Sequence, residues 1–395
     1  MTADILFQDF HPHCPKDSLT DMAQPNSHAE SLVGNGSSKS KVAVVYTRPE
    51  TVFEDIGKAM RLADYQTHLP ANIATLLKIN ISWQYYYPAC STSPWQLEGV
   101  IKTLQEDGYN DLIAAHNGTV VVDSFEGEVR NKQKPVQDKY NLPNIHLDVP
   151  PNKWIPFQPK GEMLVLDKIF PEGLTIPETF PGKNVVHLPT MKTHVFTTMT
   201  GAMKNAFGGL LNRRRHWTHS VIHETLVDLL TIQKEIHPGI FAVMDGTFAG
   251  DGPGPRAMRW HEKNVFLAGA DQVAIDAVAA KLMGFDPMSI KFIRLAHERG
   301  LGCGDPSQIE LVGEDISGVN WHFEGAQNTF ASRGQKLIYW GPLKPLENIL
   351  LRSPIAPWSF VASNLYHNAY WLRFIGNRRV KAAMKTGWGQ LFQQY

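Results

Sequence analysis

Short apolar runs alternate with stretches of helical spacing along most of this chain. Residues 42–46 form a continuous apolar run, which is typical of a strand that is covered on both faces. Residues 94–108 carry apolar side chains at helical intervals, with Ser93 in front as an N-cap and Gly108 as the stop. Further strands are predicted at residues 74–80, 112–115, 163–166, 184–188, 241–245 and 265–268, and further helices at about 220–236, 272–283 and 288–299.

Strands that alternate with helices predict an α/β fold with a mostly parallel sheet flanked by helices. In such sheets the ligand binds beyond the carboxyl ends of the strands. Polar residues at the ends of the predicted strands are Lys78 and Asn80, His116 and Asn117, Lys192 and His194, and Asp245. The pattern therefore predicts a site at this edge of the sheet.

The same pattern divides the chain into three parts. Residues 1–40 have few large apolar side chains after Phe10 and end in a Gly/Ser-rich segment, so we expect a flexible N-terminal arm. Residues 41–315 form the expected α/β core, in which residues 120–162 have weak periodicity and are interpreted as a long loop or a small insertion. Residues 316–395 form a C-terminal extension that prolines interrupt.

The C-terminal extension is aromatic and basic. After Glu347 it contains no Asp or Glu, whereas basic residues lie among several Trp, Tyr and Phe residues. Aromatic side chains bury large areas wherever a groove exists, so the extension can pack on the core. A basic, aromatic segment can also lie on an anionic membrane surface. For residues 348–395, packing on the core and peripheral contact with a membrane or a protein both stay open.

Composition narrows the class of protein. The chain has 395 residues, of which 43% are apolar and 19% charged, as expected for a globular protein with an ample core. The 38 basic residues balance 38 acidic residues, so we expect no nucleic-acid partner. We see no secretory signal and no apolar run of about 18 residues that would cross a membrane.

The number and spacing of the cysteines indicate a cellular compartment and exclude one kind of iron–sulfur site. Cys14, Cys90 and Cys303 are far apart, and such an odd, low count is typical of a reducing cytoplasm. A cluster held only by cysteines needs more thiolates than the chain has, so its cysteines alone ligate no iron–sulfur cluster.

The densest chemistry lies between Val186 and His223. This stretch contains five Lys or Arg residues, five histidines and no carboxylate, so its cations face an anion or are neutralised by acids from elsewhere in the fold. Lys192 and His194 directly follow a predicted strand. The glycines of Thr200–Gly209 can expose backbone N–H groups to an anion, with Lys204 aimed at it, or they can serve tight turns and close packing.

Three histidines close this stretch. His216, His219 and His223 are spaced by three and four residues, so they can share one helical face and hold a metal ion. The H-E-x-x-H order is absent. The alternative is that they cap the helix, pair with acids, or bind the same anion as Arg213–Arg215.

Carboxylates form a second group of candidates. Asp245 closes a predicted strand and Asp251 lies in a Gly/Pro-rich loop, where carboxylates hold Mg²⁺ or another hard cation, act as a base, or form Asx-turns. Asp271 is the expected N-cap of the helix at 272–283. Asp276 lies inside that helix and needs a cationic partner, for which the lysines of the first stretch are candidates.

Several pieces of the chain occur together in one known family, in the same order. They are Lys78-x-Asn80, Pro189-x-x-Lys192-Thr193-His194, Thr200-Gly201-Ala202-x-Lys204-Asn205 with Gly208, Asp245-Gly246 with Gly252-Pro253-Gly254-Pro255, Asp271-x-x-Ala274-x-Asp276-Ala277, and Gly300-Leu301-Gly302. Over residues 41–315 the chain thus resembles the family catalogued as domain of unknown function 362. The resemblance implies a fold and a set of site residues, but no reaction. Family members often carry a ferredoxin-like module, whose cysteines this chain lacks.

Two functional hypotheses of different class follow. The first is an enzyme that acts on a small phosphorylated or carboxylated molecule with His194 as acid/base, and with a divalent metal as a cofactor candidate. Its proposed catalytic residues are His194, Lys192 and Asp245, its anion-binding residues Lys78, Asn80, Lys204, Asn205 and Arg213, and its metal ligands Asp245 and Asp251 or His219 and His223. The second is a non-catalytic carrier of a cofactor or metal that docks through the basic tail.

Overall fold

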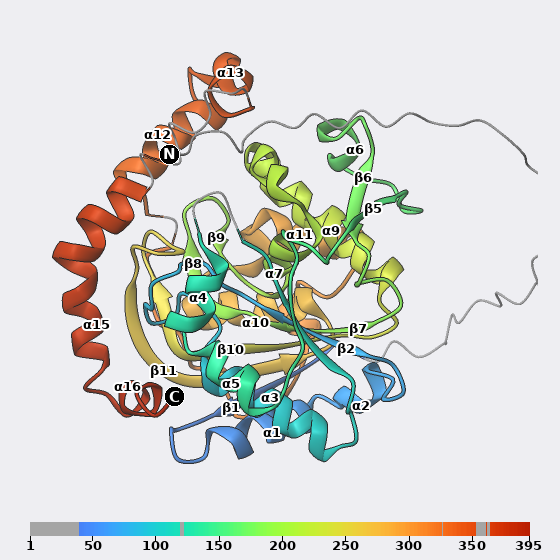
Figure 1. The fold of residues 1–395 in the computed structure, drawn as a ribbon, viewed down its shortest axis with the longest axis vertical. Coiled ribbons are helices and arrows are strands. Elements are labelled where there is room, and N and C mark those ends of the chain that lie inside the picture. Colours follow the sequence, from blue (N-terminus) through green and yellow to red (C-terminus); the bar gives the residue numbers. More distant parts are fainter. Residues whose placement is uncertain (1–38, 119–121, 326, 353–360, 362–363) are drawn as a thin grey trace, which may run out of the picture. The chain divides into compact units, whose positions relative to one another are not determined.

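A ten-stranded mixed sheet forms the centre of the molecule (Figure 1). The computed structural model describes residues 39–118, 122–325, 327–352, 361 and 364–395. The strand order is β12-β1-β11-β10-β7-β2-β3-β4, and β8 pairs with both β10 and β9. These strands are β1 (Lys41–Tyr46), β2 (Thr75–Ile79), β3 (Leu112–His116), β4 (Asn144–His146), β7 (Asn184–Leu188), β8 (Thr190–His194), β9 (Thr198–Met199), β10 (Ile240–Asp251), β11 (Arg259–Gly269) and β12 (Glu310–Gly313).

Most neighbouring strands in this sheet run parallel. The exceptions along the strand order are at β11, which is antiparallel to β1 and to β10, and β8 and β9 form a further antiparallel pair. The α/β fold with a mostly parallel sheet is therefore confirmed. A separate antiparallel pair consists of β5 (Trp154–Phe157) and β6 (Leu174–Pro177).

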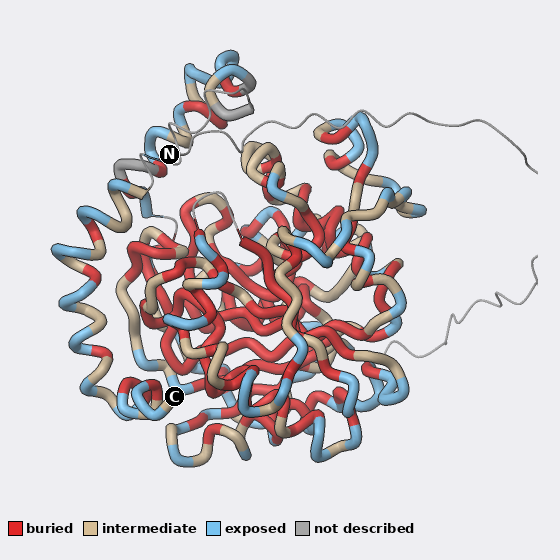
Figure 2. The backbone as a smooth tube through the Cα atoms, in the orientation of Figure 1, coloured by how far each residue is buried: buried red, intermediate tan, exposed pale blue. Residues whose placement is uncertain are grey.

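Helices cover both faces of the sheet. Because successive side chains of a strand point to opposite faces, Leu76 and Leu77 belong to two different apolar clusters. One cluster packs the Leu76 face against α9 (Ile222–Ile236), α10 (Gln272–Met283) and α11 (Lys291–Glu298), and the other packs the Leu77 face against α1 (Val52–Leu62) and α3 (Pro94–Glu106). Figure 2 shows that burial is concentrated in and around the central sheet.

The expected helix caps are present. Ser93 accepts a hydrogen bond from the backbone N–H of Gln96 at the start of α3, with Pro94 in the first turn. Asp271 accepts hydrogen bonds from the backbone N–H groups of Val273 and Ala274 at the start of α10. These caps satisfy N–H groups that a helix leaves unpaired at its start, so the sequence located both helix starts correctly.

One expectation about local structure is wrong. Residues 163–166 form no strand: they lead into α6 (Leu166–Ile169), because Asp228 of α9 accepts the backbone N–H groups that a neighbouring strand would need. Of the two alternatives for the stretch 120–162, the small insertion fits better than the long loop, since its described residues contain α4 (Ser124–Arg130), α5 (Gln133–Lys139), β4 and β5.

From Phe330 onward the described part of the C-terminal extension consists mainly of helical segments. They are α12 (Phe330–Tyr339), α13 (Glu347–Arg352), a π-helical segment at Leu365–Gly376, α15 (Asn377–Ala383) and α16 (Gly387–Phe392). Trp371 and Trp388 are buried in the same apolar cluster as α3, and the Trp388 indole donates to Asn264 at 2.7 Å. The expected arm at residues 1–40 lies outside the described residues except for its last two. In the described ranges, no helix is long and apolar enough to span a bilayer.

Candidate functional site

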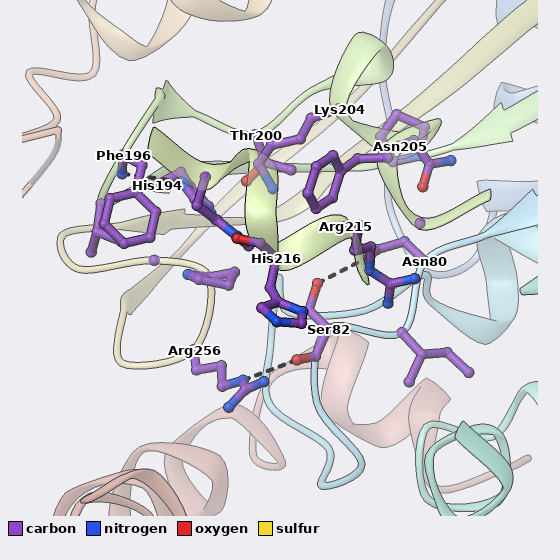
Figure 3. A pocket seen from close by; sticks show the side chains of 18 of the residues that line it. Asn80, Ser82, His194, Phe196, Thr200, Lys204, Asn205, Arg215, His216 and Arg256 are labelled. Carbon is purple, nitrogen blue, oxygen red and sulfur yellow. Dashed lines mark hydrogen bonds between the residues drawn. The ribbon is translucent and has the colours of Figure 1, made fainter. Parts of the chain in front are cut away.

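A cavity of about 300 Å³ opens at the carboxyl ends of the central strands (Figure 3). Residues just after β2, β3 and β7 line it, together with the end of β8. The remaining wall comes from α7 (Ala202–Asn205), the start of α8 (Phe207–Leu210), the 3₁₀ segment at Arg213–Val221, the loop at Pro253–Arg256, and α12. This placement agrees with the rule that open α/β sheets bind ligands beyond their strand ends.

The cavity wall is strongly basic. Its cations are Lys78, Lys204, Arg213, Arg215 and Arg256, and its histidines are His194, His216, His219 and His367. None of the described residues that line the cavity is Asp or Glu. Because like charges repel one another across a small volume, this wall is arranged for an anion.

The two lysines in the wall have unusual acidity. Burial, together with the positive charge of Arg215, lowers the pKa of Lys78 to about 7. Burial, Lys192 and Arg215 lower the pKa of Lys204 to about 7 as well. An amine that titrates near neutral pH can both give and accept a proton, which is the property of a general acid or base.

Lys204 and Lys78 are held differently. Lys78 donates to the backbone oxygen of Ile79 at 2.6 Å, and it passes Gly209 so closely that a Cβ there would lie 2.9 Å from its Cε atom. Lys204 lies over the ring of Phe207, with 5.1 Å from Nζ to the ring centroid, and has no hydrogen-bond or ion-pair partner among the described residues. Lys204 is therefore the cation best placed to meet a ligand.

His194 is fixed in one tautomer. Its Nδ1 atom accepts a hydrogen bond from the backbone N–H of Phe196 at 3.2 Å, so the proton of the neutral ring is on Nε2. Burial and the charge of Lys204 lower the pKa of His194 well below the usual value, which keeps the ring neutral. In this state the imidazole is a hydrogen-bond donor to the cavity, rather than a ready base.

The amides of the predicted anion site have supporting contacts. Asn205 donates to the backbone oxygen of Lys78 at 2.8 Å, and Asn80 accepts from Ser82 at 3.0 Å. Arg213 is exposed and reaches Asp148 at 3.5 Å. The five residues predicted to bind the anion, Lys78, Asn80, Lys204, Asn205 and Arg213, all line this one cavity.

Lys192 lies behind the cavity wall. It is fully buried, is absent from the cavity lining, and donates to Cys90, to Thr190 at 2.8 Å and to Ser82 at 3.3 Å. Burial lowers its pKa to about 8. Because Ser82 itself lines the cavity, Lys192 supports the wall and adds positive charge to it without facing the ligand.

Asp245 is separated from the cations. Phe241 and Val243 pack on the α3 side of the sheet, so Asp245, two residues further along β10, faces that side too, whereas Lys78 alternates with Leu77 and faces the opposite side. There Asp245 accepts from the Ser93 hydroxyl and lines a separate, much smaller cavity.

The predicted cation site at the two aspartates is not formed. Asp251 pairs with Arg259 at 3.0 Å and accepts from the backbone N–H of Glu324 at 2.8 Å. The six-residue separation along β10 corresponds to roughly 20 Å in a strand, so Asp245 and Asp251 do not share an ion.

His219 and His223 have different environments. The Nδ1–H group of His219 donates to the backbone oxygen of His216 at 3.0 Å, and the His219 ring stacks on Tyr339. The ring of His223 stacks on Phe292 at 5.9 Å. The described residues contain one group of three metal-ligating side chains in close contact, and neither histidine belongs to it.

The glycine motif binds a carboxylate of the chain itself. Asp276 accepts hydrogen bonds from the backbone N–H groups of Ala202 at 2.6 Å and Met203 at 3.1 Å. These N–H groups are therefore not offered to an external anion, and the partner of Asp276 is backbone rather than a lysine. A Cβ on Gly201 would lie 2.2 Å from the Asp276 carboxylate, so this glycine is required by close approach.

Sequence reasoning named only part of the wall. Arg215, which the sequence named within Arg213–Arg215, donates to the backbone oxygen of Gly118 at 2.7 Å. Arg256, which it did not name as a site residue, donates to the backbone oxygen of Ser82 at 3.0 Å (Figure 3 shows both arginines). Arg256 lies in the loop after β10, directly behind the glycine- and proline-rich motif, and this position is the signal that could have found it. Residues from the C-terminal extension, Thr329, Ser332, Gln335, Tyr339 and His367, also line the cavity, and no local pattern marks them.

Comparisons with known proteins identify similar sequences. A family model described as domain of unknown function (DUF362) matches residues 75–281. A protein of Synechocystis sp. named thylakoid-associated protein sll1697 is 30% identical over 135 residues, which cover 32% of this chain and 40% of that protein. No solved structure matches the chain.

Proposed function

The chain belongs to the domain of unknown function 362 family, and we propose that it is an enzyme that acts on a small anionic molecule, phosphorylated or carboxylated. The observation that carries the proposal is the basic cavity at the strand ends, whose described lining has five Lys or Arg side chains and no carboxylate. Cations that lie close together in a partly buried cavity repel one another, so an anionic ligand that binds there stabilises the site strongly.

The residues divide into two roles in this proposal. Lys78, Arg215 and Arg256 hold the anion, because charge-assisted hydrogen bonds are the strongest that a protein offers to phosphate or carboxylate. Lys204 transfers a proton to or from the bound molecule, since its pKa is lowered to about 7. His194 donates Nε2–H to developing negative charge, which replaces the acid/base role that the sequence suggested for it.

Calorimetry with simple probes tests anion binding. Pyrophosphate and citrate, titrated separately, distinguish a phosphate site from a carboxylate site. A bound anion raises the pKa of Lys204, so at pH 8 we expect uptake of roughly one proton per chain, seen as a dependence of the heat on the buffer. Lys204→Met should weaken binding by at least about tenfold, whereas the exposed Lys58→Met should not change it. Equal affinities of these two variants would contradict the assignment.

An assay of turnover distinguishes the proposed enzyme from the non-catalytic carrier. Incubation with a defined mixture of phosphorylated and carboxylated metabolites, followed by ³¹P and ¹³C NMR, should show conversion by the wild type and none by Lys204→Met. Binding of a metabolite without any conversion would favour the carrier that the sequence left open. Asp245 and Asp251 have no part in either version, because they do not face the cavity.

One observation favours a further role in docking on an anionic membrane surface. Large apolar side chains are exposed along the extension, at Leu337, Trp340, Leu343, Leu346, Ile349, Val361, Leu365, Tyr370 and Phe374. Exposed basic residues follow them at Arg373, Arg378, Lys381 and Lys385. Apolar side chains that insert at the headgroups and cations that meet anionic lipid form the usual pair of contacts of a peripheral protein.

The similar protein of Synechocystis is named as thylakoid-associated, which supports this docking. We propose that the chain acts in the cytoplasm, at the surface of a membrane. Flotation with vesicles that contain anionic lipid should recover the wild type and lose the double variant Leu365→Asp, Phe374→Asp. Val129→Asp, which changes a similarly exposed apolar residue of α4, is the control. Equal recovery of all three proteins would remove the membrane from the proposal.

A further inference from the structure

A compact group of two histidines and one carboxylate lies at the edge of the sheet. His116 ends β3 and His146 ends β4, and the two residues are direct partners in this parallel pair, so their side chains lie on the same face. Glu128 of α4 reaches the same point, and the ligand atoms of the three residues lie within 4.8 Å of one another. From this convergence we propose that His116, Glu128 and His146 bind a divalent metal ion of the Zn²⁺ type, which has a structural role.

The distances fit a tetrahedral ion. The Oε2 atom of Glu128 lies 3.1 Å from Nε2 of His116 and 3.4 Å from Nε2 of His146. Metal–ligand bonds of about 2.0–2.1 Å in tetrahedral geometry place the ligand atoms about 3.3 Å from one another. Both distances from Glu128 therefore match those between ligands of one small ion, and the two histidine nitrogens lie within 4.8 Å of each other.

Asn144 completes the set. It lies two residues before His146 on β4, and its amide group is 2.6 Å from Glu128 Oε2 and 3.3 Å from Nε2 of both histidines. Its amide oxygen is buried without a hydrogen-bond partner. Exchange of the amide oxygen and nitrogen, which are equivalent in shape, brings that oxygen to the centre of the group as a fourth ligand.

The surroundings favour a permanently bound ion. Glu128 and His116 are both buried, so water competes little with them for an ion. Ser124 contacts Nδ1 of His146 at 3.3 Å and Phe125 stacks on the ring at 3.7 Å, which fixes its orientation and covers it from solvent.

The position of the group indicates what the ion does. It joins β3, α4 and β4 at the sheet edge, and Asn117, the residue after His116, lines the basic cavity. With Asn144 the protein supplies four ligands and leaves no open position for a substrate, which is the mark of a structural zinc site. The ion would hold this edge of the cavity in place.

Metal analysis and zinc titration of the full chain test the inference. We expect one equivalent of Zn²⁺ with a dissociation constant below 1 µM, a rise in the unfolding temperature on binding, and intense visible absorption when Co²⁺ replaces Zn²⁺. Glu128→Gln keeps the shape of the side chain and should weaken Zn²⁺ binding by more than about 100-fold, because loss of an outer partner alone costs 10–100-fold. His322→Ala, at an exposed histidine, should bind as the wild type does.

Two results would overturn the inference. One is a wild type whose dissociation constant for Zn²⁺ is about 1 µM or weaker; the other is equal binding by the wild type and Glu128→Gln. If Glu128→Gln is unstable, His146→Ala serves as the second variant, since this histidine is only partly buried. Lys204→Met should bind Zn²⁺ as the wild type does, because Lys204 lines the basic cavity and is not part of the metal group, so failure of the metal site and failure of the anion site are observed separately.

Discussion

Lys204→Met should make the ligand-free protein more stable. The lowering of the Lys204 pKa from 10.5 to about 7 means that folding disfavours its charged form. At about 1.36 kcal/mol per unit the shift corresponds to about 4–5 kcal/mol. Because the side chain lines an open cavity and is only partly buried, we expect about 2–3 kcal/mol of added stability at pH 6.5.

The lowered pKa of Lys204 also determines how the stability of the wild type changes with pH. Between pH 7 and 10.5 the unfolded chain binds more protons at this lysine than the folded chain does, so the wild type gains stability as the pH rises through this window. The advantage of Lys204→Met should accordingly shrink from pH 6.5 to pH 9.5. Lys58→Met, at an exposed lysine, should show neither the gain nor the pH dependence.

Urea denaturation at the two pH values, with and without pyrophosphate, measures both effects. Pyrophosphate should stabilise the wild type more than Lys204→Met, so that the order of stability is reversed when ligand is present at high concentration. A Lys204→Met protein that is destabilised equally at pH 6.5 and 9.5, and that responds to pyrophosphate as the wild type does, would refute the assignment of Lys204 as an unpaired cation in the cavity.

Two substitutions test the scaffold. Gly201→Ala places a Cβ 2.2 Å from the Asp276 carboxylate and should lower the free energy of unfolding by at least about 2 kcal/mol. Gly318→Ala is the control, because a Cβ there meets nothing within 4 Å. Equal midpoints of thermal unfolding for the two variants would contradict the close approach at Gly201. Trp388→Ala removes a buried ring whose centroid lies 5.2 Å from that of Trp95. In urea denaturation it should lower the free energy of unfolding by about 3–5 kcal/mol. A decrease below about 1 kcal/mol would show that the extension is not part of the core.

The alternation of apolar runs and helical stretches predicted β1, β2, β3, β7, β10 and β11 and the principal helices, but not β4, β8, β9 and β12. It succeeded where local chemistry and tertiary packing agree, as at Ser93 and Asp271, whose side chains satisfy the first N–H groups of their helices. It failed at residues 163–166, whose apolar residues suit a strand, because a distant carboxylate, Asp228, takes their N–H groups. A contact across 60 residues leaves no trace in a local pattern.

The candidate site, like the fold, was predictable from local sequence only in part. The rule about strand ends placed Lys78, Asn80 and His194 in one cavity, because parallel strands end at the same edge. It also placed Asp245 at that edge, but the rule does not say which face of the sheet a side chain uses. Counting alternate positions back to Phe241 would have assigned Asp245 to the α3 face. The contribution of Tyr339 and His367 depends on how the extension folds back, which no spacing reveals.

The C-terminal helices that form the outer wall of the cavity have one side toward the cavity and one side toward solvent. Tyr339 faces the ligand space, whereas its neighbour Trp340 is exposed to solvent, and His367 and Tyr370 divide in the same way one turn apart. In the docking proposed above, a membrane in contact with Trp340 and Tyr370 would also restrain Tyr339 and His367. Docking should therefore change the rate at which a small molecule enters and leaves the cavity.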